Sequence, residues 1–74
     1  MHWETLVGAN IRRLRKERNL TQEQLALSAS VDLRYFGGIE RGEHSPTIGV
    51  VGRIAATLGV HPSLLFNEAS GENG

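Results

Sequence analysis

The sequence predicts an all-α domain of five short helices. Apolar residues recur at the three- and four-residue spacing of helices, and no stretch alternates as strands do. Helix-start signals, in which Thr or Asp precedes an apolar stripe, recur along the chain. A chain of 74 residues suffices for one small domain. It has no cysteine, which excludes disulfides and thiolate metal sites, so tight helix packing or a partner chain must supply stability.

The first helix is expected from about Thr5 to Arg18, and Asn19 is a suitable place for it to end. A dense start signal follows, because Thr21 fits the N-cap and Gln24 the N3 position of a capping box. The residues expected to face the core from these first two helices are Val7, Ile11, Leu14, Leu25, Ala26 and Ala29.

The third helix is expected to open on Asp32, whose carboxylate favours a helix N-terminus, and to close at Gly42, which suits a left-handed C′ position. Its inward stripe consists of Phe36, Ile39 and Glu40. The opposite face carries no large apolar residue and consists of Arg34, Gly37, Gly38 and Arg41.

The fourth helix follows a polar loop, Glu43 to Pro46, and is expected from about Thr47 to Leu58, with Gly59 ending it. Its expected inward residues are Ile48, Val51, Ile54, Ala55 and Leu58. A short fifth helix starts at His61, with Pro62 at its N1 position. We therefore expect a domain over residues 1–66 and a polar, glycine-rich, disordered tail over residues 67–74.

The charge is unevenly distributed. The net charge is zero, which argues mildly against a nucleic-acid partner, because a basic total is the usual footprint of one. Yet five of the eight cations lie within seven residues, at Arg12, Arg13, Arg15, Lys16 and Arg18. This run is either a binding surface or a solvated helix face. No apolar run approaches the roughly 20 residues that span a bilayer, and a signal peptide is not apparent, so no membrane partner is expected and the cytoplasm is the expected compartment.

No motif in the sequence indicates enzymatic or metal chemistry. The three histidines, His2, His44 and His61, lack the spacing of metal ligands, and no serine lies in a nucleophile motif. Gly37 and Gly38 do not make a phosphate-binding loop, because no strand precedes them and the GxGxxG spacing is absent. We expect neither an enzyme nor a bound metal or cofactor.

Three segments together carry a family resemblance: IRRLRKERNLTQEQLA, YFGGIERGEHSPTI and IAATLGVHPSLLF. At these separations they resemble the lambda-repressor-like, Cro/CI-type helix-turn-helix family, or XRE family, over about residues 8 to 66. The resemblance implies a helix-turn-helix in the second and third helices. It further implies a sequence-specific regulator of transcription that binds double-stranded DNA as a homodimer, with residues 32–42 in the major groove. Two departures are Ser30, where the family often has glycine, and the pair Gly37 and Gly38, where longer polar residues are common.

Nine residues are candidates for DNA contact. Arg34 lies where family members read bases, and a bidentate arginine–guanine contact is worth about 1–3 kcal/mol. Leu33, beside it, can reach only a thymine methyl or a sugar, and the resemblance places Gln22 next to a phosphate. The glycine pair either lets the helix backbone approach the groove or permits close helix packing. The full set is Gln22, Leu33, Arg34, Tyr35, Gly37, Gly38, Arg41, His44 and Ser45.

Two further sets concern structure and assembly. Arg15 and Glu40 each lie at the edge of an apolar stripe, where a charge is costly unless paired, and the resemblance implies an ion pair between them. The alternative is two independent surface charges. The candidates for a dimer interface are Leu64, Leu65 and Phe66, with Leu27 as a weaker one, and core packing is the alternative for the first three.

Other functional interpretations stay open. The run from Tyr35 to Arg41 matches the Tyr-x-x-Gly-Ile-Glu-Arg pattern of restriction-modification controller proteins. An antitoxin or a phage-type repressor fits almost as well. From another class, a protein-interaction module that keeps this fold without binding DNA agrees with the zero net charge and the double glycine.

Overall fold

The computed structural model describes residues 2–68, and over that range it is helical with no strand. Four α-helices, α1 (Trp3–Glu17), α2 (Gln22–Ser28), α3 (Leu33–Glu40) and α4 (Ile48–Leu58), precede a 3-10 helix, η1 (Pro62–Phe66). The all-α class is confirmed, whereas the prediction of five α-helices was wrong. The last segment winds as a 3-10 helix, a form common in pieces this short. Most of the predicted tail, residues 69–74, lies outside the described residues.

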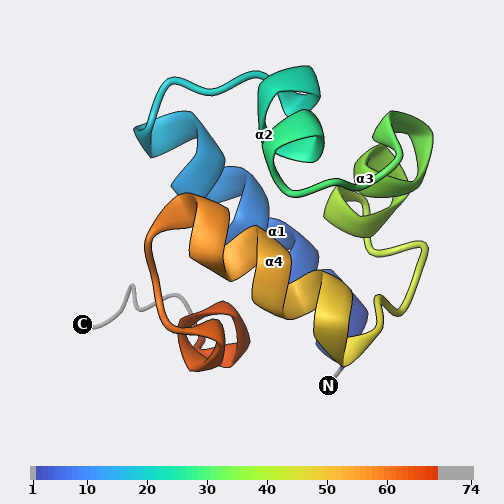
Figure 1. Ribbon diagram of the computed structural model, residues 1–74. Coiled ribbons are helices and arrows are strands. Elements are labelled where there is room, and N and C mark those ends of the chain that lie inside the picture. Colours follow the sequence, from blue (N-terminus) through green and yellow to red (C-terminus); the bar gives the residue numbers. More distant parts are fainter. Residues whose placement is uncertain (1, 69–74) are drawn as a thin grey trace.

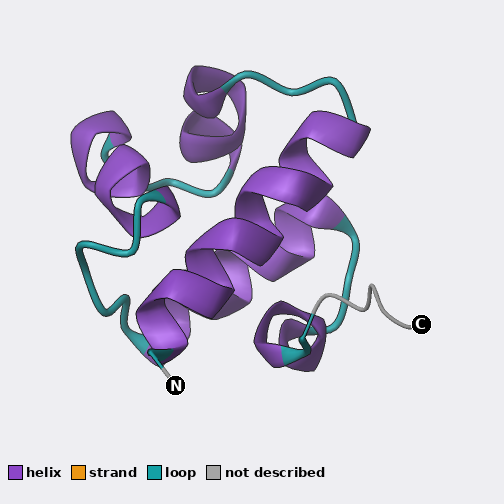
Figure 2. Ribbon diagram, turned by 180° about the vertical axis from the view of Figure 1, so that it is seen from behind, coloured by secondary structure: helices purple, strands orange, loops and turns teal. Residues whose placement is uncertain are grey.

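The helices pack around α1, which contacts α3, α4 and η1 (Figure 1). Seen from behind, α2 and α3 lie on one side of α1 and η1 lies on the other (Figure 2). The core between them is aliphatic apart from one aromatic ring. Its fully buried large side chains include Ile11, Leu25, Phe36, Ile39, Ile54 and Leu65.

Local capping signals set the helix ends. The capping box of α2 is present, because Thr21 Oγ1 accepts a hydrogen bond from Gln24 N at 3.0 Å and Gln24 Oε1 accepts one from Thr21 N at 2.8 Å. Asp32 caps α3 by accepting from the backbone amide of Tyr35 at 3.0 Å. Gly42, with φ at +77°, lies in the left-handed region directly after α3. These start and stop predictions are therefore confirmed.

One core assignment was wrong. Ile48, expected to face inward, is 91% exposed, whereas the other four residues predicted for that stripe of α4 are buried. The helix begins at Ile48, after the Thr47 cap, so its first turn extends past the core. The helical spacing of apolar residues therefore continues one turn beyond the part of α4 that faces the core.

Two features outside α3 fix its position. Gly8 of α1 lies against the end of α3, where a Cβ atom would be 2.3 Å from the carbonyl oxygen of Ile39, so only glycine permits this approach. The turn between α2 and α3 holds Ser30 at φ +59°, a left-handed conformation that costs about 1–2 kcal/mol for a residue with a Cβ. Arg53 of α4 supports this turn, because its Nε donates to the Ala29 carbonyl at 2.9 Å.

Candidate nucleic-acid interface

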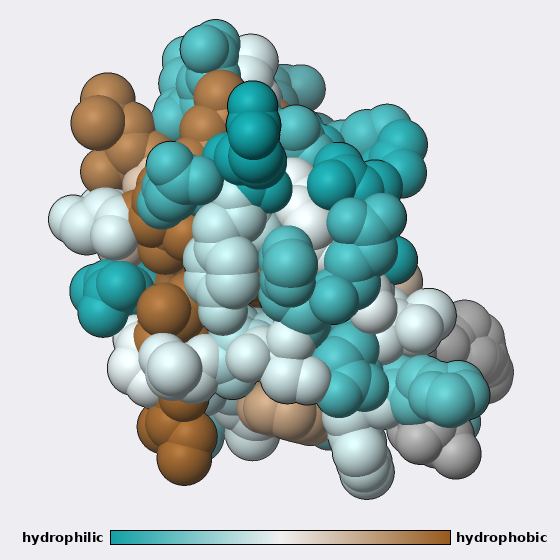
Figure 3. Space-filling model, turned by 90° about the vertical axis from the view of Figure 1, so that its right-hand side faces the viewer, coloured by the Kyte–Doolittle hydropathy of each residue, from teal (hydrophilic) through white to brown (hydrophobic). Residues whose placement is uncertain are grey.

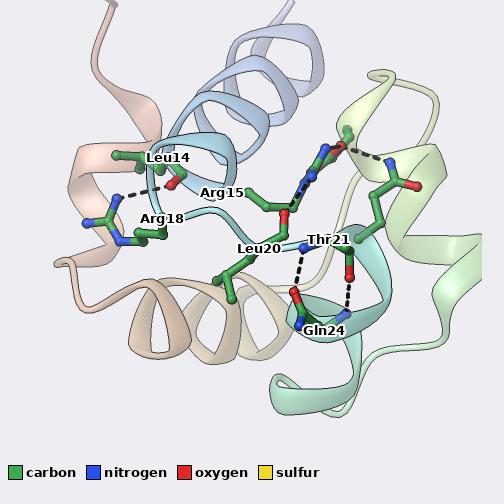
Figure 4. A network of polar contacts seen from close by, with 8 residues as sticks. Leu14, Arg15, Arg18, Leu20, Thr21 and Gln24 are labelled. Carbon is green, nitrogen blue, oxygen red and sulfur yellow. Dashed lines mark hydrogen bonds and ion pairs between the residues drawn. The ribbon is translucent and has the colours of Figure 1, made fainter.

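A buried ion pair anchors α3 to the scaffold. Arg15 Nε and Nη2 donate to the two carboxylate oxygens of Glu40 at 2.7 and 3.1 Å, and the Glu40 side chain is only 2% exposed. Arg15 Nη1 also donates to the carbonyl of Leu20 at 2.8 Å, which ties the loop before α2 to the same group (Figure 4). The pair implied by the family resemblance is therefore present, and it lies on the core side of α3.

Gln22 joins this network. Its Nε2 donates to Glu40 Oε1 at 2.9 Å, so the side chain links the first residue of α2 to the last residue of α3. This contact holds the two helices of the helix-turn-helix together. The amide of Gln22 is thus engaged within the protein, and only its remaining hydrogen-bonding capacity is left for a phosphate.

The outward face of α3 begins with exposed side chains. Arg34 is exposed in the first turn, and Leu33 before it is 42% exposed. Tyr35 is half-buried, resting against the core cluster. Figure 3 shows the side of the molecule on which α3 lies: hydrophilic side chains cover much of it, and apolar ones gather along the left edge. This face of α3 can therefore meet a polar partner.

The glycine pair is not bare, contrary to the interpretation that it offers open backbone to a groove. Both Gly37 and Gly38 are buried, because side chains from elsewhere lie over them. His44, from the loop after α3, covers Gly38, while Arg41 and Gln22 lie next to Gly37. A glycine leaves a notch in the helix surface, and here the notches are filled from within the same chain.

Arg41 and Glu43 form an exposed pair at the end of this face. Arg41 Nε and Nη2 donate to the Glu43 carboxylate at 3.0 and 3.1 Å. The hydrogen bond from Arg41 lowers the pKa of Glu43 below its ordinary value. Arg41 therefore carries its own acidic partner, which a DNA phosphate would have to replace.

Ser45 is engaged with α1. Its hydroxyl donates a hydrogen bond to the carboxylate of Glu4, which lowers the pKa of that carboxyl below its ordinary value. The loop after α3 is thereby tied to the first turn of α1. Ser45 is consequently a structural contact of this loop in the unbound protein.

The basic run on α1 is used largely within the protein. Arg15 is buried against Glu40, and Arg13 pairs with Glu17 at 3.3 Å. Arg18 Nε donates to the Leu58 carbonyl at 2.7 Å and so binds the C-terminal end of α4. Arg12 and Lys16 are exposed. The run is therefore mainly scaffold, and the cations of the candidate interface are Arg34 and Arg41.

The candidate dimer residues have different environments. Leu65 is fully buried in the core, so its assignment to an interface is corrected: it already packs against its own chain. Leu64 is partly buried against the same core, and Phe66 remains 42% exposed. Leu27 is 82% exposed on α2.

Sequence reasoning missed two residues whose side chains join separate elements of the fold. Asn10 is 1% exposed, and its Nδ2 donates to the backbone carbonyls of Leu65 and Asn67 at 2.8 and 2.7 Å. Arg53 supports the turn before α3. A signal existed for each: Asn10 interrupts the inner stripe of α1, and Arg53 is the one charged residue in the α4 sequence.

Residues 2–68 contain no group of three or more His, Cys, Asp or Glu side chains placed to hold a metal ion. In that described part of the chain, no helix has both the length and the apolar character needed to cross a membrane.

Comparisons with known proteins give consistent matches. A helix-turn-helix family profile matches residues 11–65. The immunity repressor protein of Bacillus phage phi105 is 39% identical over 62 residues, covering 84% of this chain but 43% of the repressor. An HTH-type transcriptional regulator of Sinorhizobium fredii is 38% identical over 60 residues, covering 81% of this chain and 78% of that one.

A solved structure matches along nearly its whole length. The restriction-modification controller protein C.AhdI from Aeromonas hydrophila has a TM-score of 0.83 and 33% identity, covering 85% of this chain and 96% of the controller protein. The profile, the relatives and this structure all match the segment that contains α2 and α3, so the chain belongs to the XRE-type helix-turn-helix family.

Proposed function

We propose that this protein is a sequence-specific, DNA-binding regulator of transcription that works as a homodimer, with α3 in the major groove. The observation that carries the proposal is the two-sidedness of α3. Its inner side is fixed by Phe36, Ile39 and the Arg15–Glu40 pair, while its outer side presents Arg34 and Arg41. A rigidly held helix with exposed arginines suits groove binding, because the helix must be fixed in orientation on the duplex for its side chains to read base edges.

Arg34 and Arg41 have different proposed roles. Arg34, in the first turn of α3, is placed to contact a base edge, where the N-terminal residues of a recognition helix usually read DNA. Arg41, after the last turn, is placed to contact a phosphate. Arg34→Ala should therefore change the preferred base at one position of the binding site, with a loss of about 1–3 kcal/mol there. Arg41→Ala should weaken binding evenly across sequences.

The test begins with selection of bound sites from a random duplex pool, followed by affinity measurements over a range of salt concentrations. A DNA binder loses affinity linearly on a log–log plot, and removal of one phosphate contact reduces the slope by about 1. Selection of no sequence, or binding that ignores salt, would instead favour the protein-interaction module. Arg12→Ala is the matched control, because that arginine is exposed on α1 and is not among the proposed contacts.

A second copy of the chain is the proposed occupant of one apolar face. Two adjoining hollows of about 110 and 190 Å³ share Pro46, Val51 and Phe66 in their walls. Trp3 and Ile48, which are 55% and 91% exposed, border these hollows. A face that carries both the protruding Ile48 and an adjoining hollow can fit against a second copy of itself, as a two-fold interface requires.

The dimer face has a direct test. Ile48→Glu should shift the protein from dimer to monomer in sedimentation equilibrium, because a charge would be placed in the apolar contact. Leu27→Glu, on another exposed apolar residue, is the control and should leave the dimer intact. If Leu27→Glu dissociates the dimer and Ile48→Glu does not, the interface lies on α2 instead. An inverted repeat in the selected sites would support two-fold binding.

Among regulators of this fold, the run from Tyr35 to Arg41 favours the controller type, because it matches the Tyr-x-x-Gly-Ile-Glu-Arg pattern of restriction-modification controller proteins. The chain spans less than half of the phage repressor that it matches, so the activity of that whole repressor is not transferred to it. The discriminating observation is the genomic position of the selected site: a site beside restriction or modification genes would support the controller type, and a site elsewhere would count against it.

A further inference from the structure

The middle of the recognition face is supplied by a residue that does not belong to α3. Gly38 lies one turn after Arg34, on the same face of the helix. A side chain at position 38 would normally occupy the surface next to Arg34. In this protein, the imidazole of His44 occupies it, because the loop after α3 folds back over the glycine.

The fit between His44 and Gly38 leaves no room for a side chain at position 38. A Cβ atom built there would lie 2.3 Å from His44 Cδ2 and 2.6 Å from His44 Nε2. Ordinary contact begins near 3.4 Å, so the ring would have to move by about 1 Å, the difference between 3.4 and 2.3 Å. The second glycine is less demanding, since a Cβ at Gly37 would lie 3.1 Å from Arg41 Nη1, at the end of a flexible side chain.

Tyr35 contacts a face of the imidazole. The two rings stack with centroids 5.0 Å apart and planes inclined by 30°. His44 thus packs against both the Tyr35 ring and the backbone of Gly38, yet it remains exposed to solvent. A ring restrained in this way loses little conformational entropy on binding, so it is well prepared to contact DNA.

We propose that Gly38 is a socket that positions His44, and that His44, stacked on Tyr35, is a specificity-determining residue that contacts base edges beside those reached by Arg34. This inference rests on the proposed function. Imidazole nitrogens can donate to the guanine O6 and N7 acceptors or accept from adenine N6 in the major groove. The double glycine thereby moves one base contact from the helix to the loop that follows it.

The test compares sequence preference in four variants against the site selected by the wild-type protein. His44→Ala and Gly38→Ala should each relax discrimination at the same base position, by roughly tenfold. The double variant should be no worse than either single one, because removing the imidazole leaves space for the new Cβ. Gly49→Ala is the matched control, since a Cβ at that exposed helical glycine would make only ordinary contacts, at 3.8 Å from Arg53 Nη1 and 3.9 Å from Thr47 Oγ1, and it should keep the wild-type preference.

Two further readouts separate positioning from a merely structural role. Affinity for an unrelated duplex should stay at the wild-type value in all four variants, since folding is retained. Because the two rings stack, we expect the Tyr35 ring to shift the His44 ring protons upfield in the NMR spectrum of the wild-type protein, and this shift should disappear in Gly38→Ala. The NMR measurement needs no DNA. Retention of that shift in Gly38→Ala would contradict the proposal that Gly38 positions the His44 ring.

The outcomes for this inference and for the proposed function differ. A His44→Ala variant that keeps the wild-type sequence preference overturns the inference alone. Losses that add up in the double variant also overturn it, because independent sites would be involved. A wild-type protein that selects no sequence overturns the proposed function, and the inference falls with it. Should Gly38→Ala fail to fold, His44→Ala still decides the matter, because an exposed loop residue is removed.

Discussion

Glu40→Gln should destabilise the protein by several kcal/mol. The carboxylate is 2% exposed and accepts hydrogen bonds from Arg15 at 2.7 and 3.1 Å and from Gln22 at 2.9 Å. The amide keeps the shape but removes the charge, which leaves the guanidinium of Arg15, with a side chain only 11% exposed, without its counter-ion. Breaking a buried pair in this way costs about 3–5 kcal/mol. Domains of this size have a total stability of roughly 4–11 kcal/mol.

The assay is thermal and urea denaturation followed by far-UV circular dichroism. A loss of about 3–5 kcal/mol corresponds to a fall in Tm of about 12–40 °C for a small domain. Glu17→Gln is the control, because Glu17 pairs with Arg13 at 3.3 Å while more than half of its own side chain is exposed. Exposed pairs contribute about 0–1 kcal/mol, so the control should change little.

A small effect of Glu40→Gln would refute the anchoring role of the Arg15–Glu40 pair. If Glu40→Gln costs no more than Glu17→Gln, the Arg15–Glu40 pair does not anchor α3, and the rigid positioning of the recognition helix needs another explanation. Arg15→Met combined with Glu40→Leu should recover much of the loss, since a well-packed apolar replacement of a buried pair is often neutral.

Three other predictions follow from contacts in the same region. Gly8→Ala should lower the free energy of unfolding by at least about 1–3 kcal/mol in urea denaturation, because the new Cβ would lie 2.3 Å from a backbone carbonyl oxygen of α3; a change near zero would contradict that approach. Glu43→Gln should raise affinity for any duplex in a salt titration, because Arg41 would lose its negatively charged partner; weaker binding would count against a phosphate role. Acidification should reduce stability, because the pKa values of Glu4 and Glu43 are lowered in the folded protein: their contribution is present above the ordinary glutamate pKa of 4.5 and is lost as pH falls through the lower folded values. Glu4→Gln should therefore flatten the acid limb of a stability–pH curve measured with urea, and an unchanged limb would exclude the Ser45 contact as its cause.

Much of the local structure could be predicted because its signals act over a few residues. The Thr21–Gln24 capping box and the Asp32 cap involve groups within one helical turn, so their spacing in the sequence reveals them. Gly42 marks a left-handed position for the same reason. Apolar spacing identified most of the core, and it failed for Ile48, because periodicity does not tell where a helix leaves the core.

The sequence by itself thus determined the helices, their caps and the family to which the chain belongs. Only the tertiary structure decided what covers the glycine pair, because His44 reaches Gly38 through a loop whose path no local pattern specifies. It also decided that Leu65 is a core residue and that Arg53 supports the turn before α3. Contacts of this kind join separate elements, and their geometry follows from how α1, α3 and α4 pack together, which is a property of the whole fold.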